Sequence, residues 1–164
     1  MGDVRRKHNL HSRPRKRFDS ARISSENDIV KQYGLKNKKE IWKASARVSE
    51  LRNRAKKLIP RTEAEKKEFF LRLQTLGLQV KEISDVLALT TEAVLDRRLQ
   101  TVVFRKGFSK TALEARQLIT HKNIFVDGRI VNIPSFVVTK DLESKISLKP
   151  RQEKSAKVEE KSNE

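Results

Sequence analysis

The chain has 164 residues and carries 38 Lys and Arg against 21 Asp and Glu, a formal net charge of +17 that favours a polyanionic partner. Nucleic acid is the first candidate for that partner, and an anionic membrane surface is the rival. Because the chain has no Cys and its His8, His11 and His121 are scattered, disulfides, thiolate metal sites and a Cys nucleophile are excluded, and no histidine metal site is expected.

The positive charge is concentrated in two segments. Residues 1–60 hold 18 basic and 6 acidic side chains and residues 96–150 hold 11 and 5, whereas residues 61–95 hold 5 and 6. Residues 1–43 are therefore expected to form a basic, partly extended arm. Residues 1–28 of this arm are too polar to offset the entropy of ordering without a partner. The two segments predict two basic surfaces that grip one polyanion from two sides.

The segment "YGLKNKKEIWK", residues 33–43, combines a turn with four lysines and with the only Tyr and the only Trp of the chain. An aromatic ring among lysines suits stacking on bases or sugars. The alternative is that Ile41 and Trp42 anchor a helix to the core, and this alternative is the favoured one for Trp42.

Residues 44–95 predict a small helical domain with an ordinary core. Apolar residues at helical spacing predict a helix over 44–59, which Pro60 ends. Thr62 and Glu65 form a capping-box pattern that opens a second helix, and Gly77 ends it. A shorter helix is expected over about 80–88.

Residues 96–148 predict a second module of two helices and a small antiparallel sheet, so the fold class is α+β. The segment "EAVLDRRLQTVVFRKG" predicts one helix, with Leu95, Leu99 and Val102 on its packed face and Arg98, Thr101 and Arg105 on an exposed, positive face. The next helix is expected to begin at Ser109 or Thr111, with Thr111 and Glu114 as a capping box and Leu113, Leu118 and Ile119 as the buried stripe. Its N-terminus is expected to favour binding of a phosphate near Ser109 and Lys110.

The segment "HKNIFVDGRIVNIPS", residues 121–135, predicts a β-hairpin around an Asp127-Gly128 turn. A two-stranded hairpin is marginal by itself, so its Ile and Val residues are expected to pack on the two preceding helices. Short strands are also expected at 136–138 and 145–148. Residues 149–164 are expected to form a disordered tail.

Residues 97–138, "RRLQTVVFRKGFSKTALEARQLITHKNIFVDGRIVNIPSFVV", resemble the small RNA-binding domain named after the fourth protein of the small ribosomal subunit. Together with "YGLKNKKEIWK" and the helices between, residues 1–148 resemble that ribosomal protein family in its archaeal and eukaryotic form. The short polar tail favours an archaeal member. The N-terminal cysteine zinc site of many bacterial members has no counterpart in this chain, and no cofactor is expected.

The resemblance implies a structural constituent of the small ribosomal subunit that binds the 5′ domain of small-subunit ribosomal RNA and helps to nucleate subunit assembly. It implies a cytoplasmic location in the small subunit, near the mRNA entrance and beside the fifth small-subunit protein, with mRNA as a further contact. Neither membrane binding nor a homo-oligomer is expected.

Matching the family's RNA-facing positions onto this sequence gives two groups of candidate residues. The first lies in the second module, and Arg98 and Arg116 rank highest in it because an apolar stripe fixes the direction of each helix. The second lies in the arm and on the helix that follows. The candidates are Arg97, Arg98, Gln100, Arg105, Lys106, Ser109, Lys110, Arg116, His121, Lys122, Arg129 and Asn132, and then Lys36, Asn37, Lys38, Lys39, Lys43, Arg47 and Arg54.

Three other functions compete with this interpretation. An enzyme is not expected, because the five glycines form no phosphate-binding loop and the acidic residues lie mostly at caps or beside Lys and Arg. The second alternative is a free RNA-binding or ribosome-associated factor built on the same module, but such a factor would not need the N-terminal half of this chain. A membrane-surface protein would need an amphipathic helix, which residues 41–59 match in part.

Overall fold

A computed structural model of the chain describes residues 10–149, and these form eight helices and three strands. In chain order the elements are α1 (Ser20–Tyr33), α2 (Lys38–Leu58), α3 (Glu63–Thr75), α4 (Ile83–Ala88), α5 (Thr91–Asp96), α6 (Leu99–Arg105), α7 (Ala112–Thr120), β1 (Ile124–Val126), β2 (Arg129–Ile130), α8 (Lys140–Glu143) and β3 (Ile146–Leu148). The predicted α+β class is confirmed.

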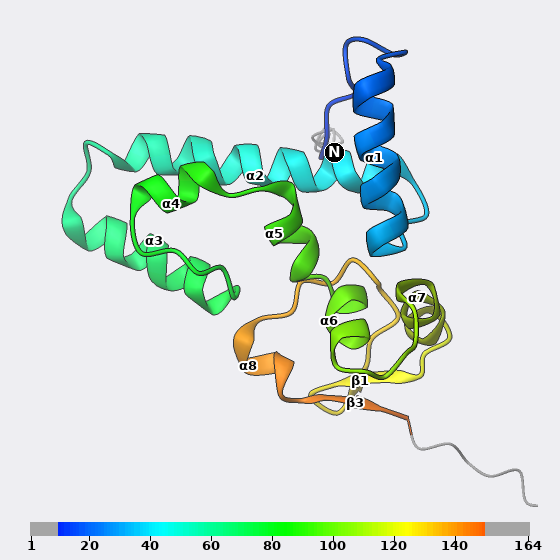
Figure 1. The fold of residues 1–164 in the computed structure, drawn as a ribbon. Coiled ribbons are helices and arrows are strands. Elements are labelled where there is room, and N and C mark those ends of the chain that lie inside the picture. The colour runs from blue at the N-terminus through cyan, green and yellow to red at the C-terminus, as the bar shows by residue number, and fades with distance from the viewer. Residues whose placement is uncertain (1–9, 150–164) are drawn as a thin grey trace, which may run out of the picture.

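The long helix α2 runs along the upper part of the molecule in Figure 1. Helix α4 lies beneath α2, α3 lies below α4, α5 runs down from α2 toward α6, and α1 crosses the N-terminal end of α2. Helices α6 and α7 and the small sheet form the lower part. No helix among residues 10–149 is long and apolar enough to cross a membrane.

Helix α1 lies inside the arm that was expected to be partly extended. Asp19 caps it by accepting a hydrogen bond from the Arg22 amide, and Gly34 ends it in the left-handed conformation. The buried carboxylate of Glu26 ties α1 to α2, because it accepts hydrogen bonds from Arg22 (2.7 Å) and from the Trp42 indole (2.9 Å). Trp42 packs beside Tyr33 and Ile41, so the prediction that it anchors a helix to the core is confirmed.

Helix α2 begins six residues before the predicted start at residue 44, because Asn37 caps it and accepts a hydrogen bond from the Lys39 amide. Leu51 and Ala55 of α2 pack against Phe69 and Leu73 of α3 in the core of the upper part. The Thr62 side chain makes no capping hydrogen bond, so the capping box predicted for α3 is not formed.

The helix predicted over 92–107 is two helices, α5 and α6, separated at Arg97 and Arg98. Arg98 is extended, with φ −75° and ψ 143°, and forms a β-bridge with Val137. The Leu99 amide donates to the Phe136 carbonyl at 2.7 Å, and the Val138 amide donates to the Arg97 carbonyl at 2.9 Å. The "FVV" segment is therefore a bridge partner at this break. Leu95, Leu99 and Val102 are buried as predicted, but Thr101 is buried as well.

Helix α7 begins as predicted, because the Thr111 side chain accepts a hydrogen bond from the Glu114 amide. Ile119 is buried, and Leu118 packs at the edge of the core. Leu113 is 64% exposed, so its predicted place in the buried stripe is wrong. Ala115 takes that place, four residues before Ile119 on the same face of the helix.

The predicted hairpin is confirmed and forms part of a three-stranded antiparallel sheet with the order β2-β1-β3. Asp127 and Gly128 both have positive φ, as a two-residue hairpin turn requires. Ile124 and Val126 are fully or almost fully buried against α6 and α7, as expected. Ile130 and Ile133 are more than half exposed, so the expectation that they pack on the helices is wrong.

Candidate nucleic-acid interface

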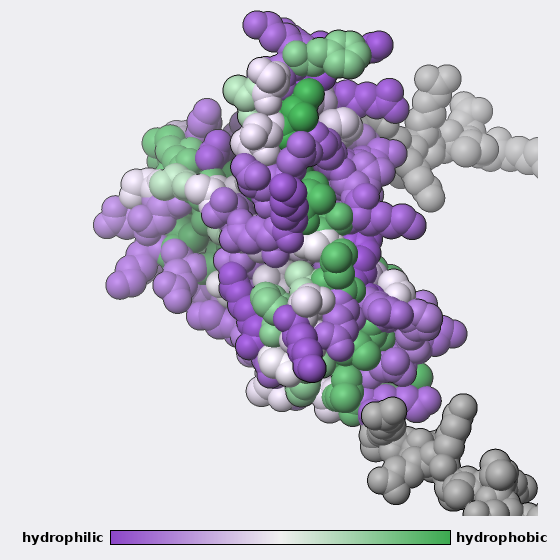
Figure 2. All heavy atoms as spheres, turned by 45° about the vertical axis from the view of Figure 1, so that its right-hand side comes forward, coloured by the Kyte–Doolittle hydropathy of each residue, from purple (hydrophilic) through white to green (hydrophobic). Residues whose placement is uncertain are grey.

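One face of α2 carries a row of exposed cations. Lys39, Lys43, Arg47 and Arg54 are spaced by four or seven residues, which places them on one side of the helix. Glu50 lies among them, 3.6 Å from Arg47 and 4.0 Å from Arg54, but all three side chains are about half exposed and such pairs are weak. Both arginines therefore remain available to phosphates. Hydrophilic side chains cover most of the face shown in Figure 2, with apolar atoms in patches between them.

Three other predicted residues of the arm lie at the start of this row. Lys36 is exposed. Asn37 is also exposed, but its side-chain oxygen is used as the cap of α2. Lys38 is half-buried with its Nζ 3.5 Å from Glu26. Of the three, Lys36 is an exposed cation without an ion pair in the described part of the chain, and Lys38 belongs to the contact between α1 and α2.

A second set of exposed side chains lies on the lower part of the molecule. Arg105 is 57% exposed and contacts Asp96 at 2.5 Å, and the Lys106 ammonium donates to the Glu143 carbonyl. Five further predicted residues are exposed, and these are Lys110, His121, Lys122, Arg129 and Asn132. The structure thus brings seven of the twelve predicted residues of this module to the surface.

The other five predicted residues of this module are internal or partly internal. Arg97 is mostly buried, donates to the Val138 carbonyl at 2.9 Å and pairs with Glu143 at 3.0 Å. Ser109 is buried, and Arg98, Gln100 and Arg116 form a polar network described below. The expectation that Arg98 lies on an exposed positive face is wrong, because the break between α5 and α6 turns it inward, where it is only 7% exposed.

Glu40 of α2 is the centre of the polar network. Its carboxylate pairs with the guanidinium groups of Arg98 and of Arg116, the latter at 3.0 Å between Glu40 Oε1 and Arg116 Nη2. Burial by itself would raise the pKa of Glu40, but the hydrogen bonds from Arg116 and Arg98 and their charges hold that pKa below its ordinary value. The two arginines ranked highest as RNA ligands are thus joined to a carboxylate within the protein.

Gln100 connects the same network to the end of α1. Its Nε2 lies 2.9 to 3.0 Å from three carbonyl oxygens, which belong to Tyr33, Gly34 and Ala112. Its Oε1 accepts a hydrogen bond from Arg116 at 3.3 Å. A Cβ added to Gly34 would lie 3.0 Å from Ala112 Cβ, so α1 and α7 approach each other as closely as glycine allows. Glu40, Arg98, Gln100 and Arg116 thus form one hydrogen-bonded network, which we call the polar latch.

The N-terminus of α7 is already occupied by a carboxylate. Glu114 accepts a hydrogen bond of 2.7 Å from the Lys110 amide, and the Glu114 amide donates to Thr111. A phosphate bound there would meet the negative charge of Glu114, so the geometry does not favour the phosphate site expected near Ser109 and Lys110. The Lys110 side chain itself remains exposed.

Several residues of this surface were not among the predicted ones. Lys57 continues the row on α2, three residues after Arg54, and its spacing was the signal. Arg13, Arg15 and Arg17 are exposed just before α1, and the high density of Arg and Lys in residues 1–28 was the signal for them. Glu40 was also missed, although it is the only acidic residue in the run 36–43. No cluster of His, Asp and Glu that could hold a metal ion is found within residues 10–149.

Known proteins with similar sequences match almost the whole chain. The family model described as the S4 domain matches residues 97–143. A protein of Methanococcus aeolicus named small ribosomal subunit protein uS4 is 42% identical over 157 residues, which are 92% of this chain and 89% of that protein. Proteins with the same name from Methanoregula boonei and Thermoplasma acidophilum are 38% and 43% identical and are covered to 85% and 74% of their length.

Proposed function

This chain belongs to the uS4 family of small ribosomal subunit proteins, and from this premise we propose that it binds the 5′ domain of small-subunit ribosomal RNA and helps to nucleate assembly of the subunit. It is a structural protein that binds ribosomal RNA, and it is not an enzyme. We further propose that it lies near the mRNA entrance in the assembled, cytoplasmic subunit, beside the fifth small-subunit protein.

The observation that carries the proposal is that the polar latch fixes one basic surface against the other. The cations of α2 begin at Lys39, next to Glu40, and Glu40 binds Arg98 and Arg116 beside α6 and on α7. The exposed Lys110 and Lys122 flank α7 at its two ends. A rigid pair of basic surfaces suits a folded RNA, because side chains cannot read the deep major groove of an A-form helix and recognition depends on shape.

We propose different roles for the exposed and for the buried residues of the two surfaces. Exposed cations displace counterions from phosphates, so affinity falls steeply as salt rises. These cations are Lys36, Lys39, Lys43, Arg47 and Arg54 on one surface and Arg105, Lys106, Lys110, Lys122 and Arg129 on the other. We propose that Arg97, Arg98, Gln100, Ser109 and Arg116 act by holding these surfaces in place, and that His121, Asn132, Asn37 and Lys38 contribute less.

Equilibrium binding of the full chain to a transcript of the 5′ domain, measured over a range of salt concentrations, tests this proposal. We expect tight binding with a steep salt dependence, and weaker binding to a transcript of another domain of the same RNA with equal length. Equal affinity for the two transcripts would mean that the chain binds polyanions without recognising the 5′ domain.

A free ribosome-associated factor is the second candidate. The relatives match 84% to 92% of this chain, so the similarity includes the N-terminal half that such a factor would not need. Sedimentation of cell extracts distinguishes the two functions. A constituent of the small subunit is found on free small subunits and on whole ribosomes, whereas recovery mainly from free large subunits would contradict the proposed function.

A further inference from the structure

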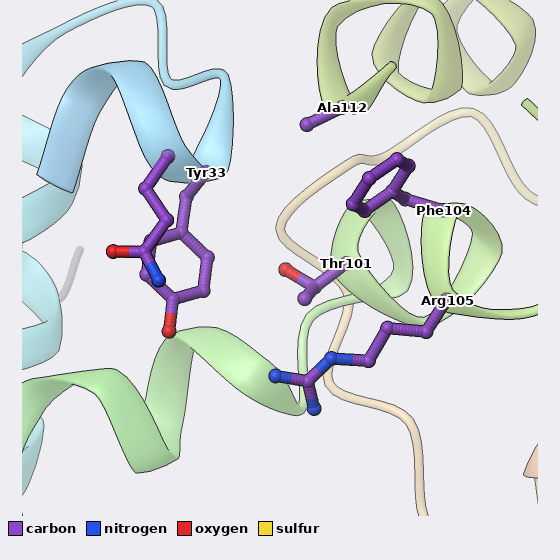
Figure 3. Close-up of a pocket in the computed structure, with 6 residues that line it drawn as sticks. Tyr33, Thr101, Phe104, Arg105 and Ala112 are labelled. Carbon is purple, nitrogen blue, oxygen red and sulfur yellow. The ribbon is translucent and has the colours of Figure 1, made fainter. Parts of the chain in front are cut away.

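A slot between two aromatic side chains lies where the end of α1 meets α6 and the start of α7 (Figure 3). Tyr33 and Phe104 lie on opposite sides of it, and Thr101 lies between them. Its volume is about 90 Å³, and its lining residues are Gln32, Tyr33, Thr101, Phe104, Arg105 and Ala112. This is the volume of about three water molecules in the liquid, so the slot has room for one small planar group.

Internal hydrogen bonds fix the walls of the slot. The Tyr33 hydroxyl donates to Asp96 at 2.9 Å, and the Thr101 hydroxyl donates to the Leu95 carbonyl at 2.8 Å. Burial and then the hydrogen bond to Asp96 raise the pKa of Tyr33, so the phenol is neutral at physiological pH. Tyr33 and Thr101 are each only 7% exposed, so they form a fixed, neutral inner wall of the slot before any ligand arrives.

The remaining wall is open to solvent and combines one apolar ring with polar side chains. Phe104 is 38% exposed although it is a large apolar residue, and the next residue, Arg105, is 57% exposed. One nitrogen of the Arg105 guanidinium contacts Asp96, and its other donors have no partner among residues 10–149. Gln32 adds an exposed amide at the rim. Aromatic faces, a guanidinium and an amide together are the groups that bind unpaired bases in RNA-binding proteins.

We propose that this slot holds a single unpaired nucleobase of the bound RNA, stacked on Phe104 and beside Arg105. This inference rests on the proposed function and adds a base-binding site to the phosphate-binding surfaces. A double helix is too wide for a slot of this size, and a phosphate alone would make no use of the exposed Phe104 ring. Stacking on an aromatic side chain is tolerant of base identity, so the slot selects for an unstacked nucleotide and not for one base.

A titration of the full chain with uridine 5′-monophosphate, followed by NMR, tests the slot without ribosomal RNA. We expect saturable shifts of the Ala112 and Thr101 methyl signals and of the Phe104 ring signals. Ribose 5-phosphate, which has the same sugar and phosphate but no base, is expected to leave these methyl signals unchanged. Equal shifts with ribose 5-phosphate would identify a phosphate site, and no shift with the nucleotide at its solubility limit would show that no base enters; either result overturns the inference.

Binding of the 5′ domain transcript by Phe104 variants gives the second arm of the test. Phe104→Leu keeps an apolar side chain of similar size but removes the ring, and we expect it to lower the affinity about fivefold or more without changing the salt slope. Phe104→Tyr is expected to retain the wild-type affinity. Phe70→Leu, a change of a half-buried ring on α3, is the matched control and is expected to leave the affinity unchanged.

The two arms separate failure of this inference from failure of the proposed function. If the wild-type chain binds the transcript and Phe104→Leu binds it equally well, the base-binding slot is wrong and the proposed function stands. If the wild-type chain does not bind the transcript, the proposed function is wrong, and the nucleotide titration still decides whether the slot takes a base.

Discussion

Glu40 accepts a hydrogen bond of 3.0 Å from Arg116, which lies 76 residues further along the chain. The same carboxylate pairs with Arg98, which is almost completely buried. Because a buried charge is tolerated only when it is paired, this carboxylate joins α2 to the start of α6 and to α7. This contact therefore helps to set the position of the basic row on α2 relative to the second basic surface, together with the apolar cluster that packs Ile41 and Ala44 of α2 against Leu95.

Removal of the Glu40 carboxylate should destabilise the fold strongly. Glu40→Ala leaves the Arg98 and Arg116 charges in a mostly buried site without a partner, and we expect the free energy of unfolding to fall by about 3–5 kcal/mol. Glu50→Ala is the matched control, because it removes an exposed carboxylate from the same helix, and it should cost less than about 1 kcal/mol. Urea unfolding followed by circular dichroism measures both. Equal losses in the two variants would contradict the central role of Glu40.

Acid should weaken the ion pairs of Glu40 with Arg98 and Arg116. The pKa of Glu40 is held below its ordinary value of 4.5, so the folded state binds a proton less readily than the unfolded chain does. The stabilisation is therefore fully present above that ordinary value and is lost as the pH falls through the lower, folded-state pKa.

Thermal unfolding measured from neutral pH down to below pH 4.5 tests this effect of acid. We expect a steeper decline for the wild-type chain than for Glu40→Gln, which has no proton to bind at this position. Parallel pH profiles would show that Glu40 does not contribute to the acid sensitivity.

Gln100, the uncharged member of the polar latch, should also contribute to stability, although less than Glu40. Gln100→Leu removes the donor that serves the carbonyls of Tyr33, Gly34 and Ala112, and buried acceptors without a donor cost about 1–3 kcal/mol. Gln117→Leu, at an exposed position of α7, is the control and should change stability by less than about 0.5 kcal/mol. Hydrogen exchange at the end of α1 gives an independent readout, since these amides should lose protection in Gln100→Leu alone.

The row of cations on α2 should set part of the salt dependence of RNA binding. The double variant with Lys39→Ala and Lys43→Ala should bind the 5′ domain transcript more weakly. Each lost phosphate contact should reduce the magnitude of the salt slope, the slope of the logarithm of the binding constant against the logarithm of the salt concentration, by about 1. Lys66→Ala combined with Lys67→Ala removes the same charge from α3, in the segment that carries no net positive charge, and should leave the slope nearly unchanged. The prediction fails if the two double variants give the same slope.

The sequence was sufficient to predict the elements whose signals are local. The hairpin at 124–130 needs only its alternating apolar residues and the Asp127-Gly128 turn, and the structure confirms it. The start of α7 needs only Thr111 and Glu114, which are three residues apart. Helical spacing also predicted part of the core of the second module, since Leu99 and Ile119 are buried as expected.

The direction of Arg98 could not be predicted, because it depends on residues far away in the chain. Local spacing favours one continuous helix over 92–107. Backbone hydrogen bonds to residues 136–138 break that helix at Arg97 and Arg98, and Glu40 then receives the Arg98 side chain. Helix α1 was not predicted for a similar reason, since its packing depends on residues of other helices. Its buried Glu26 accepts a hydrogen bond from Trp42 of α2, and its Tyr33 packs in a cluster with residues of α2 and α5.

Crosslinking of the protein to RNA in whole small subunits tests the central claim most directly. We expect crosslinked peptides from both basic surfaces, one from residues 36–54 and one from residues 105–129, and we expect both to be joined to nucleotides of the 5′ domain. Crosslinks from only one of the two surfaces, or crosslinks from both to a different domain of the RNA, would contradict the account.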